Sequence, residues 1–208
     1  MEEQIINFIK NLAETNIQIT YLTFFLSSFL QVTFPPYPGD SITILSGYIT
    51  TVSNSFKMAD VILITICGTL LGSYIVYKIG YIKGDEVLNY RWVKKFLPKK
   101  KKSKAQRMFD KYGPGAIFLS KFIPGINTII ILFSGIFKIK PRIVYISFVA
   151  AALIHNTALV LLGRFLGHNM DYITSILASY NTLVLVVVGI IIVIAFVYYR
   201  LLSKNTTE

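Results

Sequence analysis

Asp40 and Lys121 are the residues whose types and positions point most directly to chemistry. Asp40 follows a proline-glycine break within an apolar stretch, and Lys121 precedes a second such break. A charged side chain at membrane depth is costly, which by default indicates a function and a partner group. If the two breaks meet, Lys121 is the expected partner of Asp40, and a phosphate could exchange with the carboxylate. The alternatives are an N-cap role for Asp40 and a Lys121 side chain that reaches the membrane surface.

The breaks create further polar groups. Their residues are Pro38 and Gly39 in the first copy, and Pro124 and Gly125 in the second. Proline removes a backbone donor and clashes with the preceding turn, so each helix must end at its break and a new one must begin after it. Free N–H groups at such helix starts favour an anion, for example a lipid phosphate. Ser41 and Asn127 follow the breaks and are expected to add hydrogen bonds.

His155 and Asn156 form a second polar pair, in the middle of an apolar span. An imidazole there could relay protons or contact a substrate, although a hydrogen bond between helices is an equal alternative. The single cysteine, Cys67, also lies in an apolar span and is expected to be a small buried hydrophobe. The sequence contains no motif for zinc hydrolysis, nucleotide binding or a serine triad. We therefore expect no enzyme activity, no metal and no cofactor.

The two breaks belong to a pattern that occurs twice, in residues 34–84 and 122–167. In both copies a Ser-Gly pair follows the break, and a longer apolar span then ends in Gly-x-x-x-Gly. These residues are Ser46, Gly47, Gly80 and Gly84 in the first copy, and Ser134, Gly135, Gly163 and Gly167 in the second. The offsets are 86 for the breaks, 88 for the Ser-Gly pairs and 83 for the last glycines. Interrupted hydrophobic segments in corresponding halves indicate a transporter built from repeats, with its site at the breaks.

The composition is typical of a membrane protein. Hydrophobic residues make up 54% of the 208 residues and charged residues only 15%, whereas soluble domains contain about 25% charged residues. Three spans, Met58–Ile79, Ile143–Leu162 and Tyr172–Leu202, reach the length of about 20 residues that crosses a bilayer core.

The net charge of +11 is concentrated in one segment. Between Lys83 and Lys111 there are eleven lysines and arginines against three acids. Next to a membrane span, such a segment is expected on the cytoplasmic side, where it can contact anionic headgroups. A nucleic-acid role has no binding motif to support it. With this orientation, Thr20–Thr51 enters and leaves the membrane from outside, and Tyr112–Phe137 does so from the cytoplasm.

The expected fold is an all-α membrane protein with an inverted repeat. Two re-entrant helical hairpins are each followed by a transmembrane helix, and a C-terminal transmembrane helix completes the chain. Within one membrane domain, 17–208, the first repeat is expected at about 20–84, a basic cytoplasmic loop at 85–111, the second repeat at about 112–167 and the last helix at 172–202. Residues 1–16 have the apolar spacing of an amphipathic interfacial helix.

These motifs resemble the DedA family, also called the SNARE-associated or VTT-domain family, over roughly residues 20–170. The matching pieces are Pro38-Gly39-Asp40 with Ser46-Gly47, Gly68-x-x-x-Gly72 with Tyr77-x-x-Gly80, and Phe109-x-x-Tyr112-Gly113 leading to Lys121-Phe122-Ile123-Pro124-Gly125-Ile126-Asn127. The resemblance implies a two-hairpin membrane protein with inverted repeats. It also implies movement of lipids between leaflets, including the polyprenyl phosphate carrier of envelope synthesis and glycerophospholipids, linked in some members to the proton-motive force.

The chain departs from the family pattern at four positions. The second hairpin of the family usually carries Arg-x-x-Pro-Gly-x-Arg, where this chain has Lys121 and Asn127. Two acidic residues of the family correspond to Gln31 and Ser73. Loss of an acid together with a base keeps the charge balance. Lysine in place of arginine offers phosphate a point charge, whereas arginine binds phosphate through two hydrogen bonds. We hypothesise that this chain keeps the scaffold with altered headgroup choice or weaker proton coupling.

The predicted function is translocation of a phosphorylated lipid, either a polyprenyl phosphate or a glycerophospholipid, in the manner of a flippase or scramblase. The expected setting is the bacterial cytoplasmic membrane, with multiple spans and with protons and a homo-oligomer as further partners. Two alternatives stay open. One is a proton- or cation-coupled transporter of a small solute, and the other is a non-transporting scaffold whose basic loop recruits partners.

Overall fold

The computed structural model describes residues 11, 16–34, 37–89, 99–123, 126–168 and 182. Four predicted features lie outside these residues, wholly or almost so. They are the N-terminal amphipathic helix, the C-terminal transmembrane helix, the break residues Pro124 and Gly125, and residues 90–98 of the basic segment.

The described residues form six α-helices and one short 3-10 helix, and they contain no strand. The helices are α2 (Ile17–Thr33), α3 (Gly39–Val52), α4 (Met58–Asn89), α6 (Lys99–Ser120), α7 (Asn127–Ile136), α8 (Pro141–Phe165) and the 3-10 helix η1 (Leu166–His168). The expected all-α fold class is confirmed over this part of the chain.

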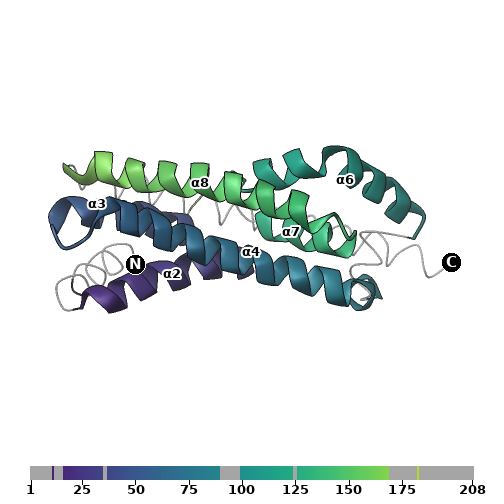
Figure 1. The fold of residues 1–208 in the computed structure, drawn as a ribbon, viewed down its shortest axis with the longest axis horizontal. Coiled ribbons are helices and arrows are strands. Elements are labelled where there is room, and N and C mark those ends of the chain that lie inside the picture. Colours follow the sequence, from purple (N-terminus) through teal and green to yellow (C-terminus); the bar gives the residue numbers. More distant parts are fainter. Residues whose placement is uncertain are drawn as a thin grey trace.

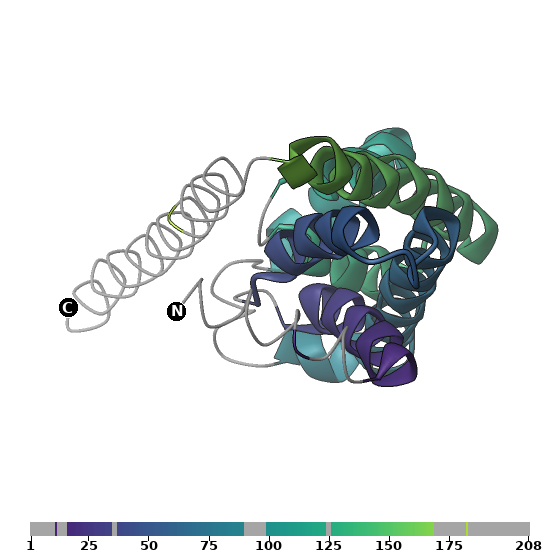
Figure 2. The same ribbon diagram turned by 90° about the vertical axis from the view of Figure 1, so that its left-hand side faces the viewer.

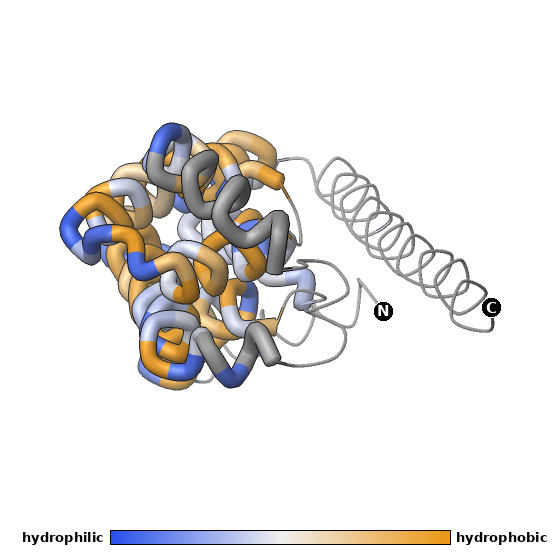
Figure 3. Tube along the Cα trace, turned by 90° about the vertical axis from the view of Figure 1, so that its right-hand side faces the viewer, coloured by the Kyte–Doolittle hydropathy of each residue, from blue (hydrophilic) through white to orange (hydrophobic). Residues whose placement is uncertain are grey.

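Within the described residues, two stretches are long and apolar enough to cross a membrane, Met58–Gly84 in α4 and Pro141–Phe165 in α8. At 1.5 Å per residue, the 25-residue α8 is about 38 Å long, which exceeds the hydrocarbon core of about 30 Å. Large apolar side chains project outward from both helices, with Leu63 and Ile146 each 61% exposed. Much of the helical trace in Figure 3 is orange, the colour of hydrophobic residues. Such an apolar exterior is typical of a surface that contacts lipid.

The shorter helices form two hairpins along opposite halves of the long pair (Figure 1). α2 and α3 lie along one half, and α6 and α7 lie along the other. Seen end-on, α3 lies between α2 and α8 (Figure 2). The hydroxyl of Thr128, at the start of α7, donates a 2.6 Å hydrogen bond to the carbonyl of Val32, near the end of α2. The end of α2 therefore lies close to the start of α7, as expected if the two hairpins meet.

The second helix of each hairpin packs closely against the long helix that follows the other hairpin in the sequence. α3 packs against α8, and α7 packs against α4. Glycines make these contacts, namely Gly47 against the Val160 carbonyl, Gly163 against the Ile44 carbonyl, Gly135 against the Tyr77 carbonyl and Gly80 against the Leu132 carbonyl. A Cβ at any of the four would clash with the backbone of the facing helix. Small residues thus let the backbones approach, which is how membrane helices commonly associate.

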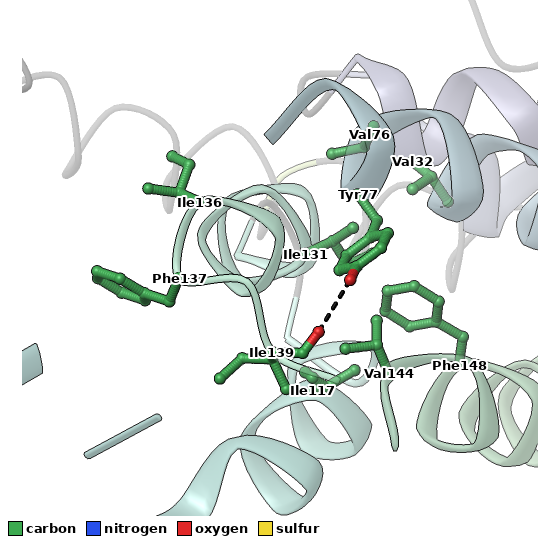
Figure 4. Packing of buried hydrophobic residues seen from close by; sticks show 10 residues of the cluster. All are labelled: Val32, Val76, Tyr77, Ile117, Ile131, Ile136, Phe137, Ile139, Val144 and Phe148. Atoms are coloured by element: carbon green, nitrogen blue, oxygen red, sulfur yellow. Dashed lines mark hydrogen bonds between the residues drawn. The ribbon is translucent and has the colours of Figure 1, made fainter. Parts of the chain in front are cut away.

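A buried hydrophobic cluster joins α4, α7 and α8 around Tyr77 (Figure 4). The Tyr77 ring is 1% exposed, and its hydroxyl donates a 2.8 Å hydrogen bond to the carbonyl of Ile139, between α7 and α8. Val144 and Phe148 of α8 belong to the same cluster. This bond gives the buried Tyr77 hydroxyl a hydrogen-bond partner, without which its burial would be costly.

Two features differ from the sequence-based expectations. Cys67 is exposed on α4 and not buried, because a helix in lipid can be apolar on its outer face as well. The segment 85–111, predicted as a basic loop, is helical where it is described. α4 continues to Asn89, and α6 begins at Lys99.

Candidate functional site

Asp40 lies in the first turn of α3 and is only 6% exposed. Its carboxylate accepts a hydrogen bond from Nε2 of Gln31, near the end of α2. Gly39 allows this approach, because a Cβ at that position would lie 2.9 Å from Cγ of Gln31. The N-cap position of α3 is occupied by Pro38, so Asp40 is not the N-cap residue that one alternative proposed.

His155 brings an imidazole from α8 to the same carboxylate. Its Nδ1 lies 3.8 Å from Oδ1 of Asp40, and the two side chains are 11% and 8% exposed. The ring of Phe122 packs edge-on against the imidazole, with centroids 5.3 Å apart. The aromatic contact fixes one side of the ring and limits its access to water.

Lys121 completes the group from the turn that follows α6. It is 6% exposed, so its side chain does not extend to the membrane surface as the other alternative proposed. Its charge interacts with Asp40 and with His155, yet Nζ donates no hydrogen bond to any described group. A buried ammonium is costly unless it is paired and hydrogen-bonded, so this position favours water or an anion.

We call Gln31, Asp40, Lys121 and His155 the central polar cluster. Five buried side-chain atoms of the described residues lack a hydrogen-bond partner, and three belong to this cluster, namely Gln31 Oε1, Lys121 Nζ and His155 Nδ1. Folded proteins contain few such atoms. Their concentration where four segments of the chain meet therefore indicates a site for water or for a polar ligand.

The other two atoms are the hydroxyls of Ser27 and Ser28 in α2. Ser27 lies one helical turn before Gln31, so both side chains occupy the same inner face of α2. Neither serine is among the site residues expected from the sequence. The sequence does contain a pattern that could have identified them, because Ser27, Ser28 and Gln31 are polar residues at helical spacing within an apolar run.

The remaining predicted site residues have structural partners or lie nearby. Asn127 Oδ1 is 3.2 Å from the hydroxyl of Ser120, which ties α7 to α6 within one hairpin. Ser41 is buried beside Asp40 in the first turn of α3. Asn156 donates a 3.0 Å hydrogen bond to Thr69 of α4, which is the bond between helices expected as one alternative for the polar pair. Among the described residues, no three His, Cys, Asp or Glu side chains gather closely enough to hold a metal ion.

Residues 36–165 match the VTT domain, which is more than half of the chain. The protein belongs to the DedA, or VTT-domain, family. The break at Pro38 and every member of the central polar cluster except Gln31 fall within the matched range. The resemblance drawn from the sequence motifs is therefore confirmed, and the chain is a membrane protein.

Three bacterial relatives illustrate the family. The chain is 35% identical to "Alkaline phosphatase-like protein" of Lactococcus lactis subsp. lactis over 83% of its own length and 84% of the relative. It is 32% identical to the uncharacterised membrane protein YbfM of Bacillus subtilis, over 71% and 90%. It is 25% identical to "Undecaprenyl phosphate transporter A" of Staphylococcus aureus, over 87% and 89%. No solved structure shows significant similarity to the chain.

Proposed function

We propose that this DedA-family protein moves a phosphorylated lipid, either a polyprenyl phosphate or a glycerophospholipid, between the leaflets of the membrane. The observation that carries the proposal is the ammonium of Lys121, buried beside Asp40 with no hydrogen-bond acceptor among the described residues. A phosphate oxygen is the complement of such a donor. A relative that is named as an undecaprenyl phosphate transporter supports this class of ligand.

The proposal includes an inverted repeat with two re-entrant hairpins whose tips meet at mid-membrane. Equivalent contacts in the two halves support it. An offset of 88 residues relates α3 to α7, and an offset of 83 relates α4 to α8. Under these offsets the contact of Gly47 with Val160 corresponds to that of Gly135 with Tyr77. In the same way, the contact of Gly163 with Ile44 corresponds to that of Gly80 with Leu132.

The proposed mechanism moves the headgroup through the central polar cluster while the acyl or prenyl tails stay in the bilayer. Lys121 attracts the phosphate, and Asp40 neutralises Lys121 when no headgroup is bound. Competition between the carboxylate and the phosphate for one ammonium keeps the binding reversible, because the carboxylate can pair with the ammonium again when the headgroup leaves. No bond of the lipid is broken, so we propose transport without an enzymatic reaction.

The proposed setting is the cytoplasmic membrane of a bacterium, which the chain crosses several times. Under the positive-inside rule, the basic residues before and within α6 favour the cytoplasmic side for that end of the molecule. The hairpin of α2 and α3 then enters from the opposite side.

Lipid movement in proteoliposomes tests this function. Purified protein is reconstituted with a labelled glycerophospholipid or a labelled polyprenyl phosphate, and the accessibility of the headgroup in each leaflet is followed over time. We expect movement of one lipid class and loss of that movement in Asp40→Asn. Absence of movement for both lipids, from folded protein, would contradict the proposal and favour a small-solute transporter, which solute uptake by the same vesicles would then reveal.

A further inference from the structure

His155 is a buried titratable group that the proposed transport mechanism does not use. Its Nδ1 has no hydrogen-bond partner, although it lies 3.8 Å from Oδ1 of Asp40. A proton on Nδ1 would convert this contact into a charge-assisted interaction with the carboxylate. The geometry thus gives His155 a place to hold a proton but no fixed bond that requires one.

Among the described residues, the charges that act on His155 come from two segments. Asp40 of α3 and Lys121 of the turn after α6 both influence the imidazole. α4 also packs against α8 and presents there the uncharged hydroxyl of Thr69, bonded to the neighbouring Asn156. α2 contributes the uncharged amide of Gln31, which bonds Asp40. The local charge balance therefore depends on one acid, one base and the imidazole.

Charge counting links the imidazole to the headgroup. With Asp40 ionised, Lys121 protonated and His155 neutral, the cluster is neutral. A bound phosphate monoanion would leave one uncompensated negative charge in a buried site, which is costly. A proton on His155 restores neutrality. It also pairs Asp40 with the imidazolium, which leaves the ammonium of Lys121 for the phosphate.

We propose that His155 takes up a proton when an anionic headgroup binds at Lys121, so that each headgroup crosses the membrane together with one proton. This inference rests on the proposed function. The proton is assigned to His155 and not to Asp40, which stays ionised and pairs with the imidazolium.

The affinity of purified protein for dihexanoyl phosphatidylglycerol tests the inference, because this phosphodiester remains a monoanion over the range in which imidazole titrates. Uptake of one proton on binding makes the affinity rise as the pH falls, by up to about tenfold in Kd per pH unit. We expect this dependence in the wild type and in His168→Gln, which removes the chain's other histidine. In His155→Gln the Kd should not vary with pH.

Two further measurements keep the outcome decisive. Geranyl phosphate replaces the diester in the same titrations, and its own ionisation contributes equally to wild type and variant, so the difference between them still reports His155. Direct uptake of about one proton per bound diester, in weakly buffered solution, requires only the wild-type protein.

Equal pH dependence in wild type and His155→Gln, or binding without proton uptake, would overturn the role of His155 and leave the transport proposal intact. Binding of neither phosphate by folded wild-type protein would overturn both.

Discussion

Substitution of Gly163 by alanine tests the packing that holds the two halves together. A Cβ at this position would meet the carbonyl oxygen of Ile44 and would lie 2.8 Å from its carbonyl carbon and 3.1 Å from the backbone nitrogen of Tyr48. These atoms belong to the backbone of α3, which cannot rotate away as a side chain can. The methyl group must therefore push α3 and α8 apart. Overpacking of this kind typically costs about 1–3 kcal/mol.

Gly115→Ala is the matched control, because a Cβ at Gly115 in α6 meets no atom within 4 Å. Both substitutions gain the same helix propensity of about 1 kcal/mol, so the difference between the two variants reports the clash alone. For a chain of this size, 1 kcal/mol corresponds to roughly 2–4 °C in Tm. We therefore expect Gly163→Ala to unfold about 2–12 °C below Gly115→Ala when both are heated in the same detergent.

Gly80→Ala extends the test to the other half, because Gly80 faces the Leu132 carbonyl in the equivalent contact between α4 and α7. We expect a loss of stability similar to that of Gly163→Ala if the halves are related by the repeat. Equal Tm values for Gly163→Ala and Gly115→Ala would refute the close backbone approach. A large effect at Gly163 with none at Gly80 would refute the equivalence of the halves.

Three other substitutions test individual contacts. Asp40→Asn removes the anion that competes with phosphate, so we expect tighter phosphate binding and loss of lipid movement, with a rate at least about tenfold lower, which is ~1.4 kcal/mol. An unchanged rate would remove Asp40 from the mechanism. Thr128→Val deprives the Val32 carbonyl of its donor and should lower the free energy of unfolding by about 1–3 kcal/mol, whereas Thr128→Ser should retain most of it. Tyr77→Phe removes the bond to Ile139 and should cost about 1 kcal/mol in the same assay, with the cluster around the ring intact.

The approach of the two hairpins could be expected from the sequence because the repeat provides a geometric argument. Two breaks at corresponding places in two halves must approach each other if the halves face one another. The hydrogen bond between Thr128 and Val32 joins the start of α7 to the end of α2, which agrees with such an approach.

The contribution of His155 to the cluster could not be derived in this way. Periodicity places His155 within an apolar helix, but it does not fix which face of α8 points toward α3. The rotation of α8 about its axis is set by the glycine contacts, in which Gly163 packs against the backbone of Ile44. Only the packed arrangement brings the imidazole within 3.8 Å of Asp40.

Cys67 and Asn127 show why other expectations were wrong or incomplete. An apolar position in a membrane helix can face lipid as readily as protein, so hydrophobicity alone could not tell that Cys67 is exposed. Asn127 follows the second break as expected, but its amide lies against Ser120. A local hydrogen-bond partner seven residues away was available and needed no contact with the first hairpin.

The most direct test of the central claim is lipid movement by Lys121→Gln compared with Lys57→Gln in matched proteoliposomes. Both substitutions remove one lysine, but Lys57 is exposed before α4, whereas Lys121 is 6% exposed in the central polar cluster. We predict that the phosphorylated lipid that moves with wild-type protein also moves with Lys57→Gln and does not move with Lys121→Gln. Equal movement by both variants would contradict a role for the buried ammonium in carrying the headgroup.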